Sequence, residues 1–206
     1  METKGRNLKK IVAEKFNIVG NLLIFASLAI LFFTFAPVIK EEAVFRVKNS
    51  LGISSEKELT PPNTDFSIVI PKLGVAAPVF ADTDPFDPKI FLPVLRNGVA
   101  HAKGTAYPGE FGNTYLFAHS TDAFYNVGKY NAVFYLLGKL QKGDEIDIFY
   151  KGEKIKYAVR EVAVVEATAV KYLGKNGNWN TLTLQTCYPP GTTLKRLVVV
   201  ADQVNF

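Results

Sequence analysis

Three residues of this chain have side chains that together could carry out nucleophilic chemistry. Cys187, the only cysteine, stands at the end of the alternating segment Thr181–Thr186, and Arg196 stands at the start of the β-branched run Leu197–Val200. A guanidinium close to a thiol lowers the thiol's pKa and favours the reactive thiolate. A nucleophilic cysteine also needs an imidazole as a proton carrier. His119, which ends another apolar segment, is the candidate for that role.

The cysteine and the arginine are predicted to lie on two strands joined by a loop. Thr181–Thr186 alternates threonine with other residues at a period of two, as a strand does. Tyr188–Thr193 contains two prolines and a glycine, which end a strand and force a turn. Leu197–Val200 reads as a buried strand. If the two strands are neighbours, the Cys187 thiol and the Arg196 guanidinium face each other across the loop.

A lone cysteine is as often a small buried hydrophobic residue as a functional one. Here its position favours function, because Cys187 lies at a strand-to-loop edge beside the polar Thr186.

The chain has two histidines, and we assign them different roles. His101 lies in the glycine-rich segment Gly98–Gly112, which we expect to be a surface loop, and a hydrogen-bonding role is favoured there over catalysis. His119 follows the predicted strand Asn113–Ala118 and can act as acid and base beside a cysteine nucleophile. Arg196 cannot give up its proton, so it suits stabilisation of an oxyanion.

Composition and charge exclude several classes of protein. A hydrophobic content of 48% with 21% charged residues is not that of a disordered chain. A single cysteine excludes an intramolecular disulfide. Of the net charge of +5, about +3 lies in residues 1–15, which have five basic and two acidic residues, so we expect a basic tail and no nucleic-acid partner.

An uncharged stretch from Phe16 to Ile39 is long enough to cross a bilayer. A cleaved signal peptide is the alternative, but its apolar part would be shorter, and Ala36-Pro37 is a poor cleavage site. We therefore expect a transmembrane helix at 16–39, with the basic tail 1–15 on the cytoplasmic side. An extracytoplasmic linker at 40–64 and a catalytic domain at 65–206 would follow.

Downstream of the linker the chain is predicted to be all-β. The expected strands, beyond those already given, are Phe66–Pro71, Val75–Phe80 (with Pro78 at an edge or bulge), Glu145–Lys151, Lys154–Arg160 and Val162–Val170. Short helical segments are expected at Ile90–Asn97 and at Ala132–Leu137, the second capped by Gly138. Many short strands with Pro and Gly turns favour a closed barrel or a sandwich. Nothing fixes the geometry of the loop carboxylates Asp82, Asp84 and Asp87, so we expect no metal site and no cofactor.

At this point the sequence resembles a known family, the sortases, which are membrane-anchored cysteine transpeptidases of bacterial surfaces. The segments that carry the resemblance are Thr181–Cys187 with Arg196 and Leu197–Val199, the histidine motif Phe117–Ser120, the preceding loop Gly98–Asn113, and the early strand pair Ile70–Val75. The similarity runs from about Phe66 to the end of the chain, in the order of the family.

The resemblance implies a closed β-barrel of about eight strands. It implies that Cys187 attacks the carbonyl after the threonine of a Leu-Pro-X-Thr-Gly-like sorting signal on a surface protein, forming a thioester. An amine from a peptidoglycan precursor or a pilin lysine would then take the acyl group. His119 would be the acid and base, and Arg196 would stabilise the oxyanion or the substrate.

The resemblance also indicates which kind of sortase to expect. Pilin-polymerising sortases tend to carry a lid with an Asp-Pro-aromatic motif before the first strand and often a second, carboxy-terminal anchor. Asp84-Pro85-Phe86 has those letters but follows the second predicted strand, so we do not expect it to be a lid. A single-anchor enzyme of the housekeeping or class D/E-like kind is therefore expected. Lys171–Asn180, which shapes signal recognition in the family, is short here.

Three other functions stay open at this stage. An L,D-transpeptidase would show His-Gly and Ser-x-Gly-Cys motifs, and neither occurs. A membrane-tethered β domain used for adhesion or scaffolding would not need Cys187, His119 and Arg196 at strand ends. A mainly hydrolytic cysteine peptidase would use the same three residues, because water and amine compete for one thioester.

Overall fold

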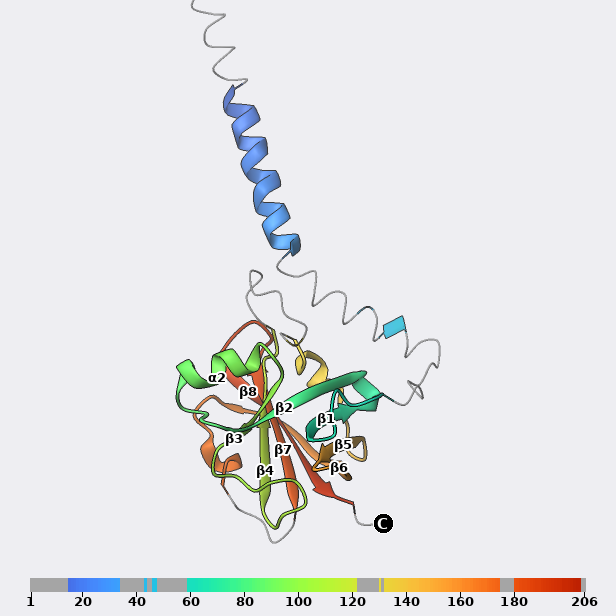
Figure 1. Ribbon diagram of the computed structural model, residues 1–206. Coiled ribbons are helices and arrows are strands. Elements are labelled where there is room, and N and C mark those ends of the chain that lie inside the picture. Colours follow the sequence, from blue (N-terminus) through green and yellow to red (C-terminus); the bar gives the residue numbers. More distant parts are fainter. Residues whose placement is uncertain are drawn as a thin grey trace, which may run out of the picture.

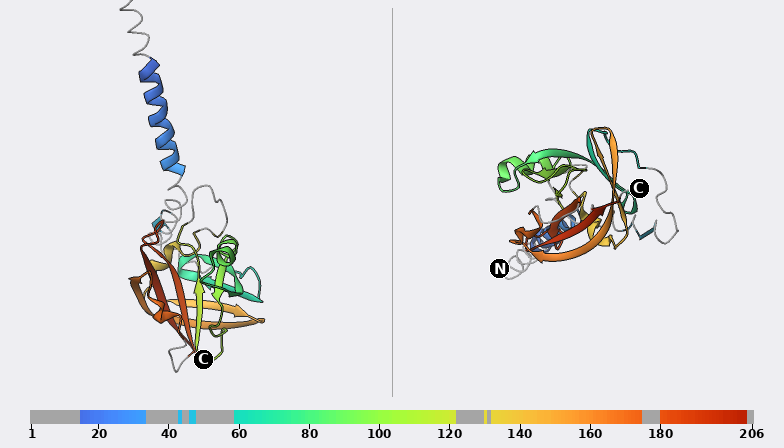
Figure 2. Two further views of the ribbon diagram at one scale, coloured as in Figure 1. Left: turned by 90° about the vertical axis from the view of Figure 1, so that its left-hand side faces the viewer. Right: turned by 90° about the horizontal axis from the view of Figure 1, so that it is seen from below.

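Downstream of the linker, the chain forms a closed barrel of eight strands (Figure 1). The computed structural model describes residues 15–33, 43, 46–47, 59–121, 130, 132–174 and 180–204. Around the barrel the strands follow the order β1-β2-β3-β4-β7-β8-β6-β5, and the end-on view in Figure 2 shows them curving about one centre. The strands are β1 Phe66–Ile70, β2 Val75–Thr83, β3 Val99–Ala102, β4 Asn113–Phe117, β5 Glu145–Tyr150, β6 Glu153–Glu166, β7 Thr181–Tyr188 and β8 Lys195–Gln203. The barrel prediction is thus confirmed, and the sandwich alternative is wrong.

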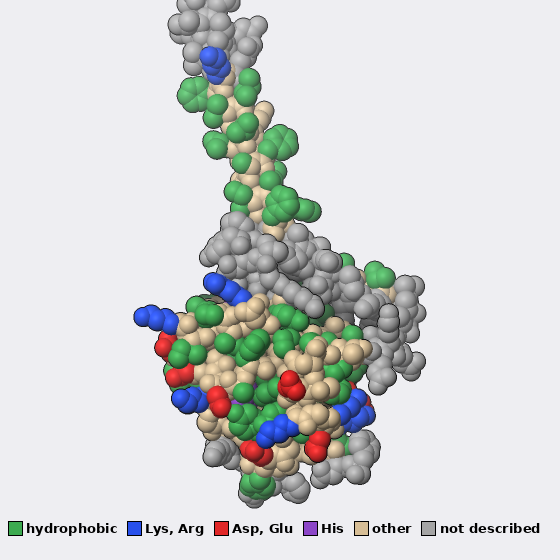
Figure 3. All heavy atoms as spheres, in the orientation of Figure 1, with side chains coloured by type: hydrophobic (Ala, Val, Ile, Leu, Met, Phe, Trp, Pro, Cys, Tyr) green, Lys and Arg blue, Asp and Glu red, His purple; other side chains and the backbone are tan. Residues whose placement is uncertain are grey.

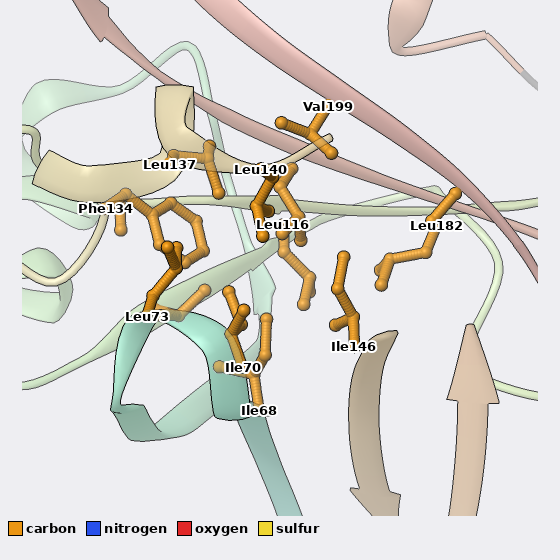
Figure 4. Close-up of a cluster of buried hydrophobic side chains, with 14 of the residues drawn as sticks. Ile68, Ile70, Leu73, Leu116, Phe134, Leu137, Leu140, Ile146, Leu182 and Val199 are labelled. Atoms are coloured by element: carbon orange, nitrogen blue, oxygen red, sulfur yellow. The ribbon is translucent and has the colours of Figure 1, made fainter. Parts of the chain in front are cut away.

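Side chains at alternate positions of the strands fill the barrel interior. Alternate residues from β1, β4, β5, β7 and β8 enter one buried cluster (Figure 4). Its fully buried members include Ile68, Leu116, Ile146, Leu182 and Val199. The residues between them on each strand point outward, so the face of β7 and β8 opposite this core is free to carry polar chemistry.

Three sequence predictions of local structure are wrong in part. Gly98–Gly112 is not all surface loop, because β3 occupies Val99–Ala102 and pairs with β2 and β4. The turn near Gly138 is a 3₁₀ helix, η2, spanning Tyr135–Lys139, so the glycine lies inside it and does not cap it. The strand predicted to reach Val170 ends at Glu166, and a 3₁₀ helix, η3, spans Val170–Tyr172; another, η1, spans Pro71–Leu73.

Strand β2 carries the irregularity that the proline predicted, but at another place. Pro78 itself pairs with Ser67 of β1, and the register with β3 shifts between Phe80 and Thr83. Because the barrel is closed, β2 is no edge strand.

The helix expected near Ile90 is α2, spanning Pro88–Leu95. The Asp87 carboxylate accepts a hydrogen bond from the Lys89 amide (2.9 Å) and caps the helix, with a proline at the first helical position. The helix packs on the outside of β2 and β3. Its apolar side and the outward side chains Tyr115 and Phe117 of β4 form a second, smaller buried cluster.

The amino-terminal apolar stretch is a helix over Lys15–Phe33, 19 residues with a mean hydropathy of 2.2. Its length and composition allow it to cross a membrane. Figure 3 shows hydrophobic side chains on both visible sides of it. The expected end of the span at residues 34–39, the basic residues 1–14 and most of the linker lie outside the described residues.

Candidate functional site

Cys187 and Arg196 lie directly opposite each other on paired strands. β7 and β8 are antiparallel, and the register pairs these two residues next to the turn that joins the strands. Both side chains are on the outer face of the barrel, because their neighbours Leu184 and Leu197 point into the core. Both are partly buried. The neighbouring strands expected from the sequence are therefore present, with Cys187 and Arg196 paired across them.

His119 reaches the same end of the sheet from the parallel neighbour of β7. β4 pairs with β7 in a register that ends with Phe117 opposite Gln185. The chain stays tied to β7 beyond that point, since the Ala118 amide donates to the Gln185 carbonyl (3.2 Å) and the Thr186 hydroxyl donates to the Ala118 carbonyl (2.9 Å). Extending the register by two residues sets His119 level with Cys187.

These three residues line a single pocket of about 1130 Å³. One wall is apolar and is built by Phe91 and Leu95 of α2, Phe117 of β4 and Leu173, which follows η3. Phe86, 75% exposed, lines the pocket as well, so the segment after β2 borders this site. A pocket of this size with a mostly apolar wall and a few polar groups is typical of a ligand site.

The Arg196 guanidinium is fixed by the turn that precedes it. Its Nη1 donates hydrogen bonds to the carbonyls of Thr193 and Lys195, each at 3.0 Å. These bonds hold a permanent positive charge at the mouth of the pocket, where it can stabilise a negative oxygen.

A buried tyrosine and a glutamine complete the polar floor, and the sequence analysis missed both. Tyr115 of β4, only 2% exposed, donates a hydrogen bond from its hydroxyl to Oε1 of Gln185. Both residues line the pocket. Burial raises the pKa of Tyr115 well above its ordinary value, and the charge of Arg196 partly offsets this, so the phenol stays neutral. The period-two pattern of Thr181–Thr186 could have revealed Gln185, because it places Gln185 on the face of Cys187.

His101 has a structural role away from this pocket. It is a buried residue of strand β3 and not a loop residue as expected. Its Nδ1 accepts from the Asp82 amide (3.4 Å), and Nε2 lies 3.1 Å from the Ala106 carbonyl and 3.0 Å from the Thr105 hydroxyl. Burial lowers the pKa of His101, which agrees with a neutral ring that carries its proton on Nε2.

The three carboxylates expected in one loop have partners within the chain, and Asp82 lies in strand β2 and not in a loop. Asp82 accepts a hydrogen bond from the Tyr107 hydroxyl (2.6 Å), which raises the pKa of that tyrosine to about 12. Asp84 accepts from the Phe86 amide (2.9 Å), and Asp87 caps α2. Among the described residues, no group of three or more His, Cys, Asp or Glu side chains could hold a metal ion.

Comparisons with known proteins agree with this arrangement. The family model described as the sortase domain matches residues 68–204. Sortase D of Bacillus subtilis is 26% identical over 172 residues, which are 81% of this chain and 78% of that protein. The crystal structure of a sortase C1 from Streptococcus suis is similar with a TM-score of 0.58 and 30% identity, covering 68% of this chain and 72% of the other. Sortase C-1 from Actinomyces oris matches with a TM-score of 0.58 and 28% identity, covering 78% and 83%.

Proposed function

Because this chain belongs to the sortase family of cysteine transpeptidases, we propose that Cys187, His119 and Arg196 cleave a sorting signal and transfer the acyl group to an amine. The signal would be a Leu-Pro-X-Thr-Gly-like segment of a surface protein. The observation that carries this proposal is the convergence of the three side chains in one pocket, with Cys187 and Arg196 paired across β7 and β8.

The chemistry follows from the three groups. The Cys187 thiolate attacks the carbonyl carbon after the threonine, and the carbonyl oxygen becomes an oxyanion that the Arg196 guanidinium stabilises. His119 donates a proton to the departing amine, and the C–N bond breaks to leave a thioester. The incoming amine then attacks the thioester and loses a proton to His119, and Cys187 leaves as the thiolate.

The acceptor amine and the cellular setting belong to the same proposal. A peptidoglycan precursor or a pilin lysine would supply the amine. Residues 65–206 would act outside the cell, tethered through a linker at 40–64 to a membrane helix at 16–39, with residues 1–15 in the cytoplasm. The apolar helix Lys15–Phe33 supports the membrane span in this proposal, and the basic residues before it support the orientation.

The test is acylation of the full chain in detergent. Purified protein is mixed with sorting-signal peptides and a panel of amines, and intact-mass spectrometry follows the protein and the products. We expect an acyl adduct on the unaltered chain that passes to an amine, and no adduct on Cys187→Ala. His119→Ala should slow acylation by at least about 100-fold, the lower end of the usual range for general acid–base catalysis.

The other outcomes separate the alternatives. An adduct that is lost only to water would favour the hydrolytic peptidase. If no peptide gives an adduct and Cys187 alkylates no faster than an ordinary thiol across neutral pH, the scaffold or adhesion domain would be favoured. Fast alkylation without an adduct would mean that the nucleophile is right and the sorting signal is wrong.

A further inference from the structure

Gln185 lies on the same face of β7 as the nucleophile, two residues before it. The residues of β7 alternate, and Leu182, Leu184 and Thr186 point toward the barrel side. Gln185 therefore points outward beside Cys187, and its side chain lines the pocket. Its partner across the sheet is Phe117, part of the apolar wall.

The hydrogen bond from Tyr115 sets the orientation of the Gln185 amide. The Tyr115 hydroxyl is buried and donates to Oε1, so the carbonyl end of the amide is turned toward β4. The Nε2 group then faces the pocket with two N–H donors. Within the described part of the chain, Nε2 donates no hydrogen bond to a protein acceptor. This donor is available to a ligand in the pocket.

The spacing along the strand matches a peptide. Two residues of extended chain span about 6.6 Å, so Gln185 and Cys187 lie as far apart as a scissile carbonyl and the carbonyl two residues away in an extended peptide. The apolar wall at Phe117 and Leu95 lies on the Gln185 side. It suits the apolar residues that precede the scissile bond of the proposed signal.

We propose that Gln185 is a substrate-binding residue that donates a hydrogen bond from Nε2 to the peptide carbonyl two residues before the scissile one, with Tyr115 as its positioning residue. In a Leu-Pro-X-Thr-Gly segment this is the proline carbonyl. The inference rests on the proposed function and adds a substrate contact to it.

A purely structural role for the pair predicts different results. In that case the Tyr115–Gln185 bond only ties β4 to β7, and its loss lowers the free energy of unfolding without changing substrate affinity. Gln185→Glu separates the two roles. A carboxylate still accepts from the Tyr115 hydroxyl, but it has no N–H to offer a peptide carbonyl. Gln185→Met removes both bonds and keeps similar length.

The experiment uses the full chain in detergent and two substrates. One is a fluorogenic Leu-Pro-Ala-Thr-Gly peptide, and the other is the same peptide with lactic acid in place of alanine. This change turns the proline carbonyl into an ester carbonyl, which is a weaker acceptor. The variants are Gln185→Glu, Gln185→Met and Tyr115→Phe. Tyr157→Phe is the matched control, since Tyr157 is another buried tyrosine and points into the core.

We expect Gln185→Glu and Gln185→Met to raise KM about three- to tenfold with little change in kcat, the loss of one hydrogen bond made equally in ground and transition states. Tyr115→Phe should raise KM by less, and Tyr157→Phe should not. The ester should lower kcat/KM of the unaltered chain about three- to tenfold and leave that of Gln185→Met nearly unchanged.

Two results would overturn the inference. If the unaltered chain is acylated normally but Gln185→Glu keeps its KM, or if the ester harms Gln185→Met as much as the unaltered chain, Gln185 does not bind this carbonyl. If the unaltered chain is acylated by neither peptide, the proposed signal fails, and the inference fails with it. Thermal unfolding of each variant separates a loss of affinity from a loss of folded protein.

Discussion

Arg196 contributes a positive charge that does not depend on pH. Hydrogen bonds to the preceding turn fix its position. Removing it should therefore reduce transition-state stabilisation more than folding. We expect Arg196→Ala to lower kcat/KM by about 100- to 1000-fold, the usual cost of losing an oxyanion donor, and Arg196→Lys to recover only part of this because an ammonium lacks the planar fork. The measurement is the rate of acylation of Cys187.

Arg160 provides the control for that substitution. It forms an exposed ion pair with Asp202 (2.7 Å) and does not line the pocket. Arg160→Ala should leave acylation unchanged and lower the free energy of unfolding by at most about 1 kcal/mol. An Arg196→Ala protein that acylates at the normal rate would remove Arg196 from the mechanism.

His101 should make folding sensitive to mild acid. Burial holds its pKa below the ordinary value of 6.5, so the unfolded chain binds the proton first as the pH falls. The contribution of His101 to the free energy of unfolding is fully present above pH 6.5. It decreases as the pH falls from 6.5 toward the pKa of His101 in the folded protein, by at most about 1.4 kcal/mol per pH unit for one proton. Urea unfolding of segment 60–206 between pH 7.5 and 5 measures this loss. His101→Gln should reduce it, and an equal slope in both proteins would contradict the assignment.

The sequence predicted the three residues that we propose to react, but not the pair beside them. Cys187, Arg196 and His119 could be predicted because each ends or begins a segment with a clear β pattern. The partnership of Tyr115 with Gln185 could not, because it depends on β4 lying parallel to β7, two strands about 70 positions apart. Nothing local to Tyr115 distinguishes it from a core aromatic.

Among the helices and strands, α2 is the one whose stability should affect the shape of the pocket. Asp87 caps its first turn, and Phe91 and Leu95 form part of the pocket wall. We expect Asp87→Ala to lower the free energy of unfolding of segment 60–206 by about 1 kcal/mol, and to raise KM modestly because the wall loosens. Asp87→Asn keeps an acceptor for the Lys89 amide and should restore both values. Urea unfolding and peptide kinetics check this, and an Asp87→Asn protein as impaired as Asp87→Ala would argue against capping.

The elements also show where sequence patterns fail. Strand β3 is four residues long and lies within a segment of four glycines, so its local composition predicts a loop. It becomes a strand because β2 and β4 pair with it from both sides. Tertiary pairing thus overrides local propensity. The hairpin of β5 and β6, by contrast, joins adjacent segments with strong alternation, and the sequence predicted it.

At the scale of the whole molecule, the closed barrel separates two sets of side chains. Inward residues form one apolar core, while the outer face of β4, β7 and β8 carries the pocket. Because the barrel is closed, it has no sheet edge that another segment must cover. All eight strands that support the site lie within residues 66–204. We therefore expect the barrel to keep its fold and peptide chemistry whatever happens to the amino-terminal helix.

Whether the helix Lys15–Phe33 anchors the chain in a membrane can be tested by substitution. At 1.5 Å per residue its 19 residues reach about 28 Å, close to the thickness of a hydrocarbon core. Replacing Leu23 and Leu28 with lysine adds about 3 kcal/mol each to the free energy of insertion, so the chain should leave the alkali-washed membrane fraction. Replacement of both with alanine is the control and should leave it there, and all proteins should react equally with peptide in detergent. The mass of the membrane-bound chain decides the remaining alternative: retention of residues 1–39 supports an anchor, whereas a chain shortened near Ala36 means a cleaved signal.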